Sequence, residues 1–373
     1  MVIAVTGHAY PWDIIGDPGF ADRVIALGLS DVTLAAAYHS ARAATPLHPG
    51  HQVVDARYAA LYRPVRQQTW GRRRLRPLGP DWVAGDDPFG AAAASLREAG
   101  LRVWAWIVLT HNTRLGTAYG DLVVTNCFGD RYPYALCPAH AEVREYAATL
   151  AAESARDVPL AGISLEACGQ LGLDHNSHHE KTAGAWTPTV ARLLSVCCCP
   201  ACRARWLAHG LDPEEVLGAL RSSVADEAEL SEDLAGELLA VRHESTDLLR
   251  SEVLDQLAEH APNVPVTLHA HADPWATGPA PGLTATAAKS VDALLVPAWS
   301  TDPGTADAVA RAAQVGLPVD AYVTVLPPAD PADLVQHVQR LVAAGASRIS
   351  LYHLGLAPGS RQPIFREVVA ALG

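Results

Sequence analysis

Positive charge is scarce in this chain of 373 residues, which contains only two lysines, Lys181 and Lys289. Lys and Arg together number 28 against 40 Asp and Glu, so the formal net charge is −12 at pH 7. Binding to a nucleic-acid backbone needs a basic face. The one basic cluster, Arg63 to Arg76, lies among tryptophan and proline and is more typical of a solvated loop. We therefore expect no nucleic-acid partner.

Long apolar runs are also missing. The longest, such as residues 91–94 and 294–298, are far shorter than the roughly 20 residues that span a bilayer. The short apolar run Val2 to Val5 follows the first residue without the basic segment or cleavage site of a secretory signal. Seven cysteines, four of them between Cys197 and Cys202, suit a reducing compartment better than a disulfide framework. We expect a cytoplasmic protein with no membrane partner, and oligomerisation stays open.

Short β-rich segments alternate with segments of helical periodicity, in a chain that is 49% hydrophobic. The predicted strands are Val2 to Thr6, Asp31 to Ala37, Arg102 to Leu109, Gly162 to Leu165, Val264 to Leu268, Ala293 to Pro297, Val319 to Val325 and Arg348 to Tyr352. The predicted helices are Ala21 to Leu27, Pro88 to Glu98, Ala141 to Ala155, Leu230 to Glu259, Thr305 to Val315, Pro331 to Ala344 and Phe365 to Leu372. The fifth crossover, Leu283 to Ser290, has the weakest helical signal. Eight β-then-α units with nearly all-apolar strands predict a single-domain (β/α)8 TIM barrel over residues 1–373.

Two insertions lengthen this predicted barrel. One covers about residues 43–87 after strand two, and the other about residues 167–229 after strand four. Both leave from the C-terminal end of a strand, the face on which such barrels carry their active sites.

Aromatic residues form only 6% of the chain, yet nearly every predicted strand has one at or just after its C-terminal end, beside polar side chains. Aromatic faces cover the C–H surfaces of a sugar and polar groups reach its hydroxyls, so this set predicts a pocket for a sugar-like polyol. For any single member, ordinary packing in the upper layer of the barrel is the alternative. The candidate binding residues are His8, Tyr10, Trp12, Tyr38, His39, Arg42, Trp106, His111, Asn112, His269, His271, Trp275, Trp299, Tyr322, Tyr352 and His353.

Glu166 at the end of the fourth strand is the strongest catalytic candidate, because a buried carboxylate is costly unless it is paired or used. A carboxylate that caps a barrel loop is the alternative. Glycoside hydrolysis needs a second carboxylate about 5 to 10 Å away, and the seventh strand ends without an acid. The remaining partners are Asp273, Asp302 and Glu180. Asp273 ranks first because it lies in an alternating polar run, whereas Asp302 also fits a helix-starting turn.

Two further clusters have metal-ligand residue types. His178 and His179 precede Glu180 in a polar loop, where they can bind substrate or metal or be incidental surface histidines, and no zinc-protease histidine pair is present. Cys197, Cys199 and Cys202 can supply three ligands of a structural zinc. A fourth ligand would then come from elsewhere, and buried free thiols are an equally weighted alternative. The candidates for that fourth ligand are Cys168, Cys127, Cys137 and the loop histidines.

Four segments between residues 102 and 206 contain motifs that are informative when taken together. They are WAWIV at 104–108, ALCPAHAEVREY at 135–146, AGISLE at 161–166 and CPACRARW at 199–206. Together they resemble the glycoside-hydrolase-like TIM-barrel families, over a little more than a quarter of the chain. The resemblance implies that Glu166 is the catalytic acid, nucleophile or base, although Asp is frequent at this position in those families and no partner acid is obvious here.

Three functional hypotheses follow. The first is a glycoside hydrolase for a small oligosaccharide or glycoconjugate, with Glu166 as nucleophile or general base, Asp273 as general acid beside Trp275, and no required cofactor. The second is a metal-dependent hydrolase, isomerase or lyase, although the His-x-His pair lies on strand five instead of strand one. Its ligands would be His8, Glu166, His269, His271 and His353. The third is a non-catalytic sugar-binding barrel.

Overall fold

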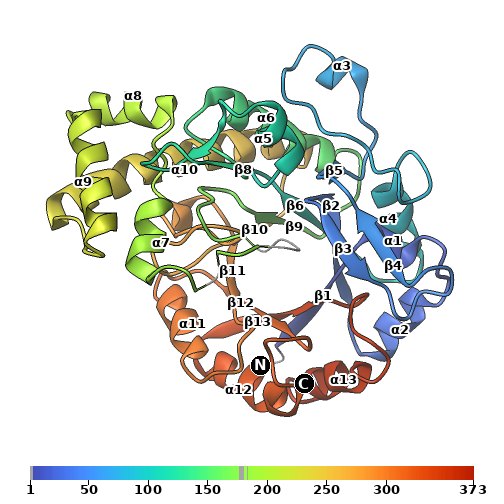
Figure 1. Cartoon of the computed structure of the whole chain (residues 1–373). Coiled ribbons are helices and arrows are strands. Elements are labelled where there is room, and N and C mark those ends of the chain that lie inside the picture. The colour runs from blue at the N-terminus through green and yellow to red at the C-terminus, as the bar shows by residue number, and fades with distance from the viewer. Residues whose placement is uncertain (1–2, 176–179, 183) are drawn as a thin grey trace.

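The computed structural model describes residues 3–175, 180–182 and 184–373, and it contains a closed barrel of eight parallel strands (Figure 1). The strands follow the order β1-β2-β6-β9-β10-β11-β12-β13, and β13 pairs with β1 to close the ring. Their bounds are β1 Ala4–Ala9, β2 Asp31–Tyr38, β6 Arg102–Val108, β9 Gly162–Glu166, β10 Val266–His269, β11 Ala293–Pro297, β12 Val319–Thr324 and β13 Ala346–Tyr352. The predicted single-domain (β/α)8 TIM barrel is confirmed.

Helices surround the strands, as Figure 1 shows. They are α2 Phe20–Ala26, α4 Pro88–Glu98, α6 Ala141–Ala155, α10 Glu232–His260, α11 Thr305–Ala313, α12 Leu334–Ala343 and α13 Gln362–Ala370. Local sequence sets their ends: the Asp87 carboxylate accepts a hydrogen bond from the Gly90 amide, and Pro88 occupies the first helical position of α4. The fifth crossover contains only the short 3-10 helix η1, Ala287–Lys289, in keeping with its weak signal.

The first strand extends further than predicted. β1 continues to Ala9, where the sequence predicted an end at Thr6, because His8 and Ala9 still pair with Thr33 and Leu34 of β2. His8 therefore lies within the barrel wall and is completely buried, not at the rim.

Segments outside the barrel pattern follow three of the strands. After β2 come the hairpin β3 (Ala41–Ala44) and β4 (Val53–Ala56), the antiparallel strand β5 (Ala60–Leu61) and α3 (Gln67–Trp70). After β9 come α7 (Pro188–Leu194), α8 (Pro200–Ala208) and α9 (Pro213–Ala225). A third segment, which was not predicted, follows β6 and contains α5 (Thr113–Ala118) and the hairpin of β7 (Val123–Thr125) and β8 (Arg131–Leu136). Its elements are too short to give a clear periodic signal. Two short helices, α1 (Pro11–Ile14) and η2 (Pro331–Asp333), complete the structure.

The arginine-rich segment after β2 contacts acidic residues of its own chain. Arg66 donates to Glu153 of α6 over 2.8 Å, and Arg74 pairs with Asp121 over 2.8 Å. Arg73 pairs with Glu145, also on α6. These pairs place carboxylates beside three arginines of the basic cluster.

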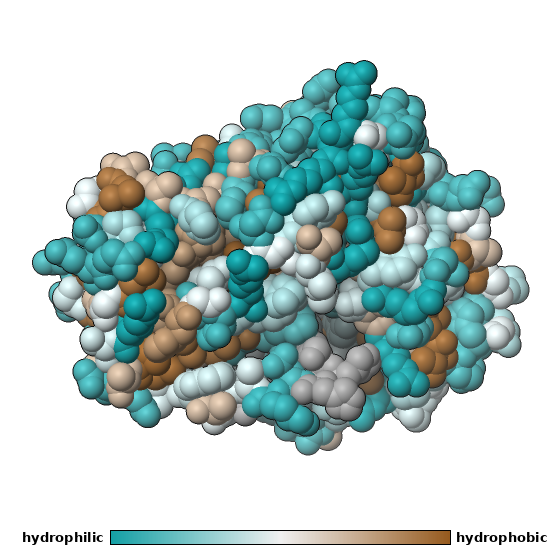
Figure 2. Space-filling view, turned by 45° about the horizontal axis from the view of Figure 1, so that its top comes forward, coloured by the Kyte–Doolittle hydropathy of each residue, from teal (hydrophilic) through white to brown (hydrophobic). Residues whose placement is uncertain are grey.

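The face seen in Figure 2 is mostly hydrophilic, with smaller apolar patches between the polar residues. Within the described ranges, no helix combines the length and the apolar character that crossing a bilayer requires.

Candidate active site

A cavity of about 760 Å³ opens at the C-terminal ends of the barrel strands. Its volume falls within the usual range for small-molecule sites. Twelve of the predicted site residues line it: Tyr38, His39, Trp106, His111, Glu166, His269, His271, Asp273, Trp275, Trp299, Tyr322 and Tyr352. The barrel thus brings residues from seven of its strands or their following loops to one aromatic and polar cavity.

Other predicted binding residues lie away from the cavity lining. His8, Tyr10, Trp12 and His353 are buried in the protein interior. Tyr10 links this interior group to the cavity, because its hydroxyl donates to the Tyr38 hydroxyl over 3.1 Å.

Two further predicted binding residues do not reach the cavity: Asn112 has a structural role and Arg42 is exposed. The Asn112 side chain accepts from the Leu115 amide at the start of α5 and donates to the Tyr146 hydroxyl. Arg42 is exposed on β3. Neither residue lines the cavity. His178 and His179 lie outside the described residues.

Glu166 is the last residue of β9 and is only 4% exposed. The Trp106 indole Nε1 donates to Glu166 Oε2 over 2.8 Å, and His269 Nδ1 lies 3.7 Å from the same oxygen. Burial raises the pKa of Glu166 to about 7, and the hydrogen bond from Trp106 opposes this rise. A carboxyl group with this pKa holds its proton in a large fraction of molecules at neutral pH.

His269 does not supply a positive charge to Glu166. Its Nε2 lies 2.8 Å from the Ser164 hydroxyl, and burial lowers its pKa to about 3. The imidazole is therefore neutral at neutral pH, so nothing on this side of Glu166 favours the ionised carboxylate over the acid.

The three partner acids proposed from the sequence occupy different places. Asp273 lines the cavity, and its Oδ1 accepts from the Trp275 amide over 2.9 Å. Asp302 is exposed and accepts from the Gly304 amide at the start of α11, which is the helix-starting turn considered above. Glu180 accepts from the Thr182 hydroxyl and is not part of the lining. Of the three, the structure brings only Asp273 to the same cavity as Glu166.

Arg192, Ser195 and Thr277 are polar lining residues that the sequence did not suggest. Asp174 was missed as well, and His175 was considered only among the loop histidines. Asp174 and His175 lie in the irregular segment after β9, where no strand end marks a position in the cavity. His175 Nε2 is 3.1 Å from His111 Nε2, and His39 stacks on His111 with ring centroids 4.4 Å apart. Burial lowers the pKa of His39 to about 4 and that of His111 well below its usual value. This rim therefore presents neutral imidazoles, which can donate to and accept from hydroxyl groups.

Four buried cysteines form the one group of metal-ligand residue types that lie close together in the part of the chain that the structure describes. Cys137, Cys197, Cys199 and Cys202 have sulfur atoms within 4.8 Å of one another. The histidines and Glu166 of the second hypothesis form no such group. Cys137, which directly follows β8, is the fourth member, whereas Cys127 and Cys168 lie elsewhere.

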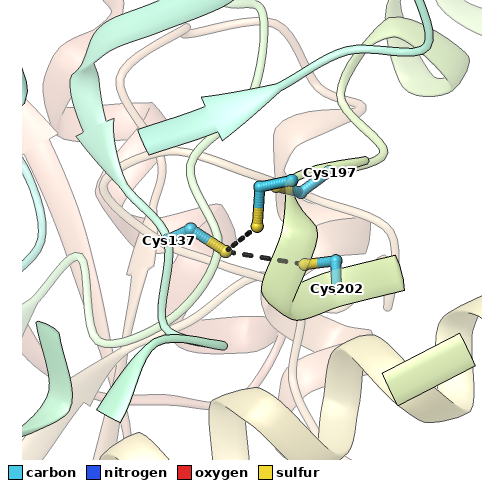
Figure 3. A group of neighbouring side chains, drawn as sticks. Cys137, Cys197 and Cys202 are labelled. Carbon is cyan, nitrogen blue, oxygen red and sulfur yellow. Dashed lines mark hydrogen bonds between the residues drawn. The ribbon is translucent and has the colours of Figure 1, made fainter. Parts of the chain in front are cut away.

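The spacing of these sulfur atoms fits a tetrahedral metal centre. Cys137 Sγ lies 3.6 Å from Cys202 Sγ and 3.8 Å from Cys199 Sγ. Zinc–sulfur bonds of about 2.3 Å in a tetrahedron place the sulfurs about 3.8 Å apart. Figure 3 shows the Cys137 side chain from one segment facing Cys197 and Cys202 around the start of α8. The Cys199 sulfur also contacts His140 Nε2 over 3.3 Å.

Neither a family model nor a curated protein matches this chain. Solved structures of glycoside hydrolase domains do match its fold. The PgaB (BpsB) glycoside hydrolase domain from Bordetella bronchiseptica aligns with 19% identity and a TM-score of 0.61, covering 99% of each chain. The catalytic domain of beta-amylase from Paenibacillus polymyxa has 12% identity and a TM-score of 0.60, covering 99% of this chain and 98% of that one.

A third match spans only part of its protein. Alpha-L-fucosidase isoenzyme 2 from Paenibacillus thiaminolyticus has 12% identity and a TM-score of 0.61, and 99% of this chain covers 49% of that chain. The chain therefore has a TIM-barrel fold like that of glycoside hydrolase domains, at identities that establish the fold alone.

Proposed function

We propose that this protein is a glycoside hydrolase for a small saccharide or glycoconjugate and that Glu166 is its general acid. The observation that carries this proposal is a buried carboxyl group whose pKa is raised to about 7, located at the C-terminal face of the barrel in an aromatic and polar cavity. Catalytic acids are tuned toward the working pH in this way by burial.

This role differs from the nucleophile or base that the sequence suggested for Glu166. The Trp106 N–H occupies one carboxyl oxygen, so the other oxygen is the one that carries the proton. When that proton passes to the glycosidic oxygen, the leaving group departs as an alcohol. The Trp106 hydrogen bond then stabilises the carboxylate that remains.

Asp273 is the best-placed base in the proposed reaction. It removes a proton from a water molecule as the water oxygen bonds to the anomeric carbon, and the anomeric configuration inverts. Burial, and not a neighbouring carboxylate, raises the pKa of Glu166. This favours a wide separation between the two acids, with room for water, over the close pair of a retaining enzyme.

Aromatic faces in the cavity support a sugar as the substrate. The rings of Trp299 and Tyr352 stack 5.2 Å apart, and Tyr322 meets Trp299 edge-on at 5.8 Å. Such surfaces suit the C–H faces of a pyranose, while the neutral histidines at the rim suit its hydroxyl groups. The cavity volume fits a short oligosaccharide better than an extended polymer.

Hydrolysis of a panel of aryl glycosides tests this function. Glu166→Gln should lower kcat by at least about a hundredfold, the typical contribution of a general acid. Glu98→Gln, at an exposed position on α4, is the matched control and should retain wild-type activity. Absence of cleavage across the panel, or full activity in Glu166→Gln, would show that the proposed function is wrong.

A structural zinc ion held by Cys137, Cys197, Cys199 and Cys202 is the second part of the proposal. The donor set is all thiolate, as in closed structural sites, and it provides no open position for substrate. Bound zinc would join the end of β8 to the start of α8. Metal analysis of the purified chain should give one zinc per molecule, and Cys202→Ser should lose it. A wild-type chain with no bound metal would refute this part.

A further inference from the structure

Arg242 lies in the N-terminal half of α10, between the cysteine cluster and the wall of the cavity. One terminal nitrogen of its guanidinium donates to the Ala276 carbonyl over 2.6 Å, and the group lies 5.7 Å from the centre of the Trp275 ring. The next residue of the helix, His243, has its Nε2 3.2 Å from the Pro274 carbonyl. Helix α10 therefore holds segment 273–276, which contributes Asp273, Trp275 and Ala276 to the cavity lining.

A second, much smaller cavity lies on the other side of this arginine. It measures about 20 Å³, room for about one water molecule, and is lined by Arg242, Gln170, Trp275 and the cysteines Cys197 and Cys202, among others. The second terminal nitrogen of Arg242 is buried and has no partner among the described residues, and the same holds for the Gln170 amide nitrogen. Two buried donors thus belong to side chains that share a cavity with two of the cluster sulfurs.

The charge of Arg242 needs a counter-charge. Among the described residues, its guanidinium bonds to the Ala276 carbonyl and to no carboxylate, and an uncompensated buried cation is strongly destabilising. Four thiolates around one zinc ion carry a net charge of −2, whereas four neutral thiols carry none. Burial lowers the pKa of Arg242 to about 10, and the charge of Asp273 opposes this fall.

We propose that Arg242 is the positioning residue that balances the charge of the metal-loaded cysteine cluster and, through Ala276 and Trp275, makes the order of cavity segment 273–276 depend on metal binding. This inference rests on the zinc site proposed above and not on glycoside cleavage. When the metal is lost, Arg242 loses the negative charge on the side of the cluster and keeps only the attraction of Asp273. Its contacts with segment 273–276 then weaken, although the segment lies outside the metal's own ligand set.

Hydrogen exchange of the full-length chain tests the proposal without any substrate. In wild type, removal of the metal should increase exchange in peptides covering residues 271–282. In zinc-loaded Arg242→Gln these peptides should already exchange fast, and metal removal should add little. Zinc transfer to a chromogenic chelator should be about tenfold faster in this variant, as for other residues that support metal ligands. Arg205→Gln is the matched control, because Arg205 lies on α8 and pairs with Glu244 instead of contacting segment 273–276. This variant should behave like wild type.

Arg242→Lys keeps the positive charge but lacks the two terminal nitrogens of the guanidinium. It is the variant to use if Arg242→Gln fails to fold. It should release zinc at nearly the wild-type rate while residues 271–282 lose protection. Metal-dependent protection equal to wild type in both Arg242 variants would overturn this inference alone. A wild-type chain that binds no metal would overturn it together with the zinc site. A metal-bound chain with no glycosidase activity would leave it standing.

Discussion

Trp106 donates its indole N–H to Glu166 Oε2 over 2.8 Å, from β6 to the neighbouring strand β9. Because this bond favours the ionised carboxylate, it keeps the pKa of Glu166 lower than burial alone would set it. Trp106→Phe removes the donor and retains most of the ring. We expect the pKa of Glu166 to rise, so the alkaline limb of the pH–rate profile should move to higher pH while kcat falls.

The pH dependence of kcat for a cleaved aryl glycoside measures this shift. Trp186→Phe, at an exposed position, is the matched control and should leave the profile unchanged. An alkaline limb that stays in place in Trp106→Phe would show that it does not report the titration of Glu166.

The raised pKa of the buried Glu166 should also make the free energy of unfolding depend on pH. The pKa of Glu166 rises from 4.5 to about 7 on folding, so the native state binds more protons than the unfolded state between these values. The contribution of Glu166 to stability is therefore lost as pH rises through this window, at a cost of about 3 kcal/mol above it. Glu166→Gln cannot ionise and escapes this cost.

We expect the melting temperature of Glu166→Gln to exceed that of wild type by about 4 °C at pH 8.5 and to approach it at pH 4.5. Thermal unfolding at both pH values measures the difference, with Glu98→Gln as the exposed control. A difference of the same size at both pH values would mean that ionisation of Glu166 is not its cause.

The cysteine cluster gives a stability prediction that is independent of catalysis. Cys199→Ser removes one proposed zinc ligand and should lower the melting temperature and abolish zinc retention. Cys168→Ser is a matched control, because Cys168 is equally buried but lies outside the cluster. Chelation should lower the melting temperature of wild type and Cys168→Ser but not that of Cys199→Ser. Equal effects of chelation on all three proteins would argue against a zinc ion held by these thiolates.

Much of the barrel could be predicted because each strand is a short apolar run with a helical segment after it. The pattern also placed Glu166 at a strand end, where the structure finds it. It could not place Asp174 and His175, because the path of the irregular segment after β9 depends on tertiary contacts. The same limit applies to Cys137, since the position of the β7–β8 hairpin selects it over Cys127 and Cys168.

Interior polar residues were the least predictable. His8 and His353 are of a residue type that often binds substrates, but strand pairing continues past the expected end of β1 and buries His8 in the barrel. Asp302 shows the opposite case, in which a local turn motif was the better guide than proximity to a strand end. Sequence periodicity identifies faces and strand ends, whereas the depth of a side chain in the barrel depends on register.

Asp273 and Asp174 are the two cavity carboxylates besides Glu166 among the described lining residues, and a paired substitution separates their roles. Asp273→Asn removes the proposed base and should lower kcat by about 10²- to 10⁴-fold with little change in KM. Asp174→Asn should mainly raise KM, because its position next to His175 at the rim suits hydroxyl binding. Proton NMR of the first-formed sugar should show inversion of the anomeric centre, since Asp273 acts through water. Retention of configuration would show that Asp273 is not a base that acts through water. A loss of kcat in Asp174→Asn and not in Asp273→Asn would show the same, and either result would leave Glu166 as the proposed acid.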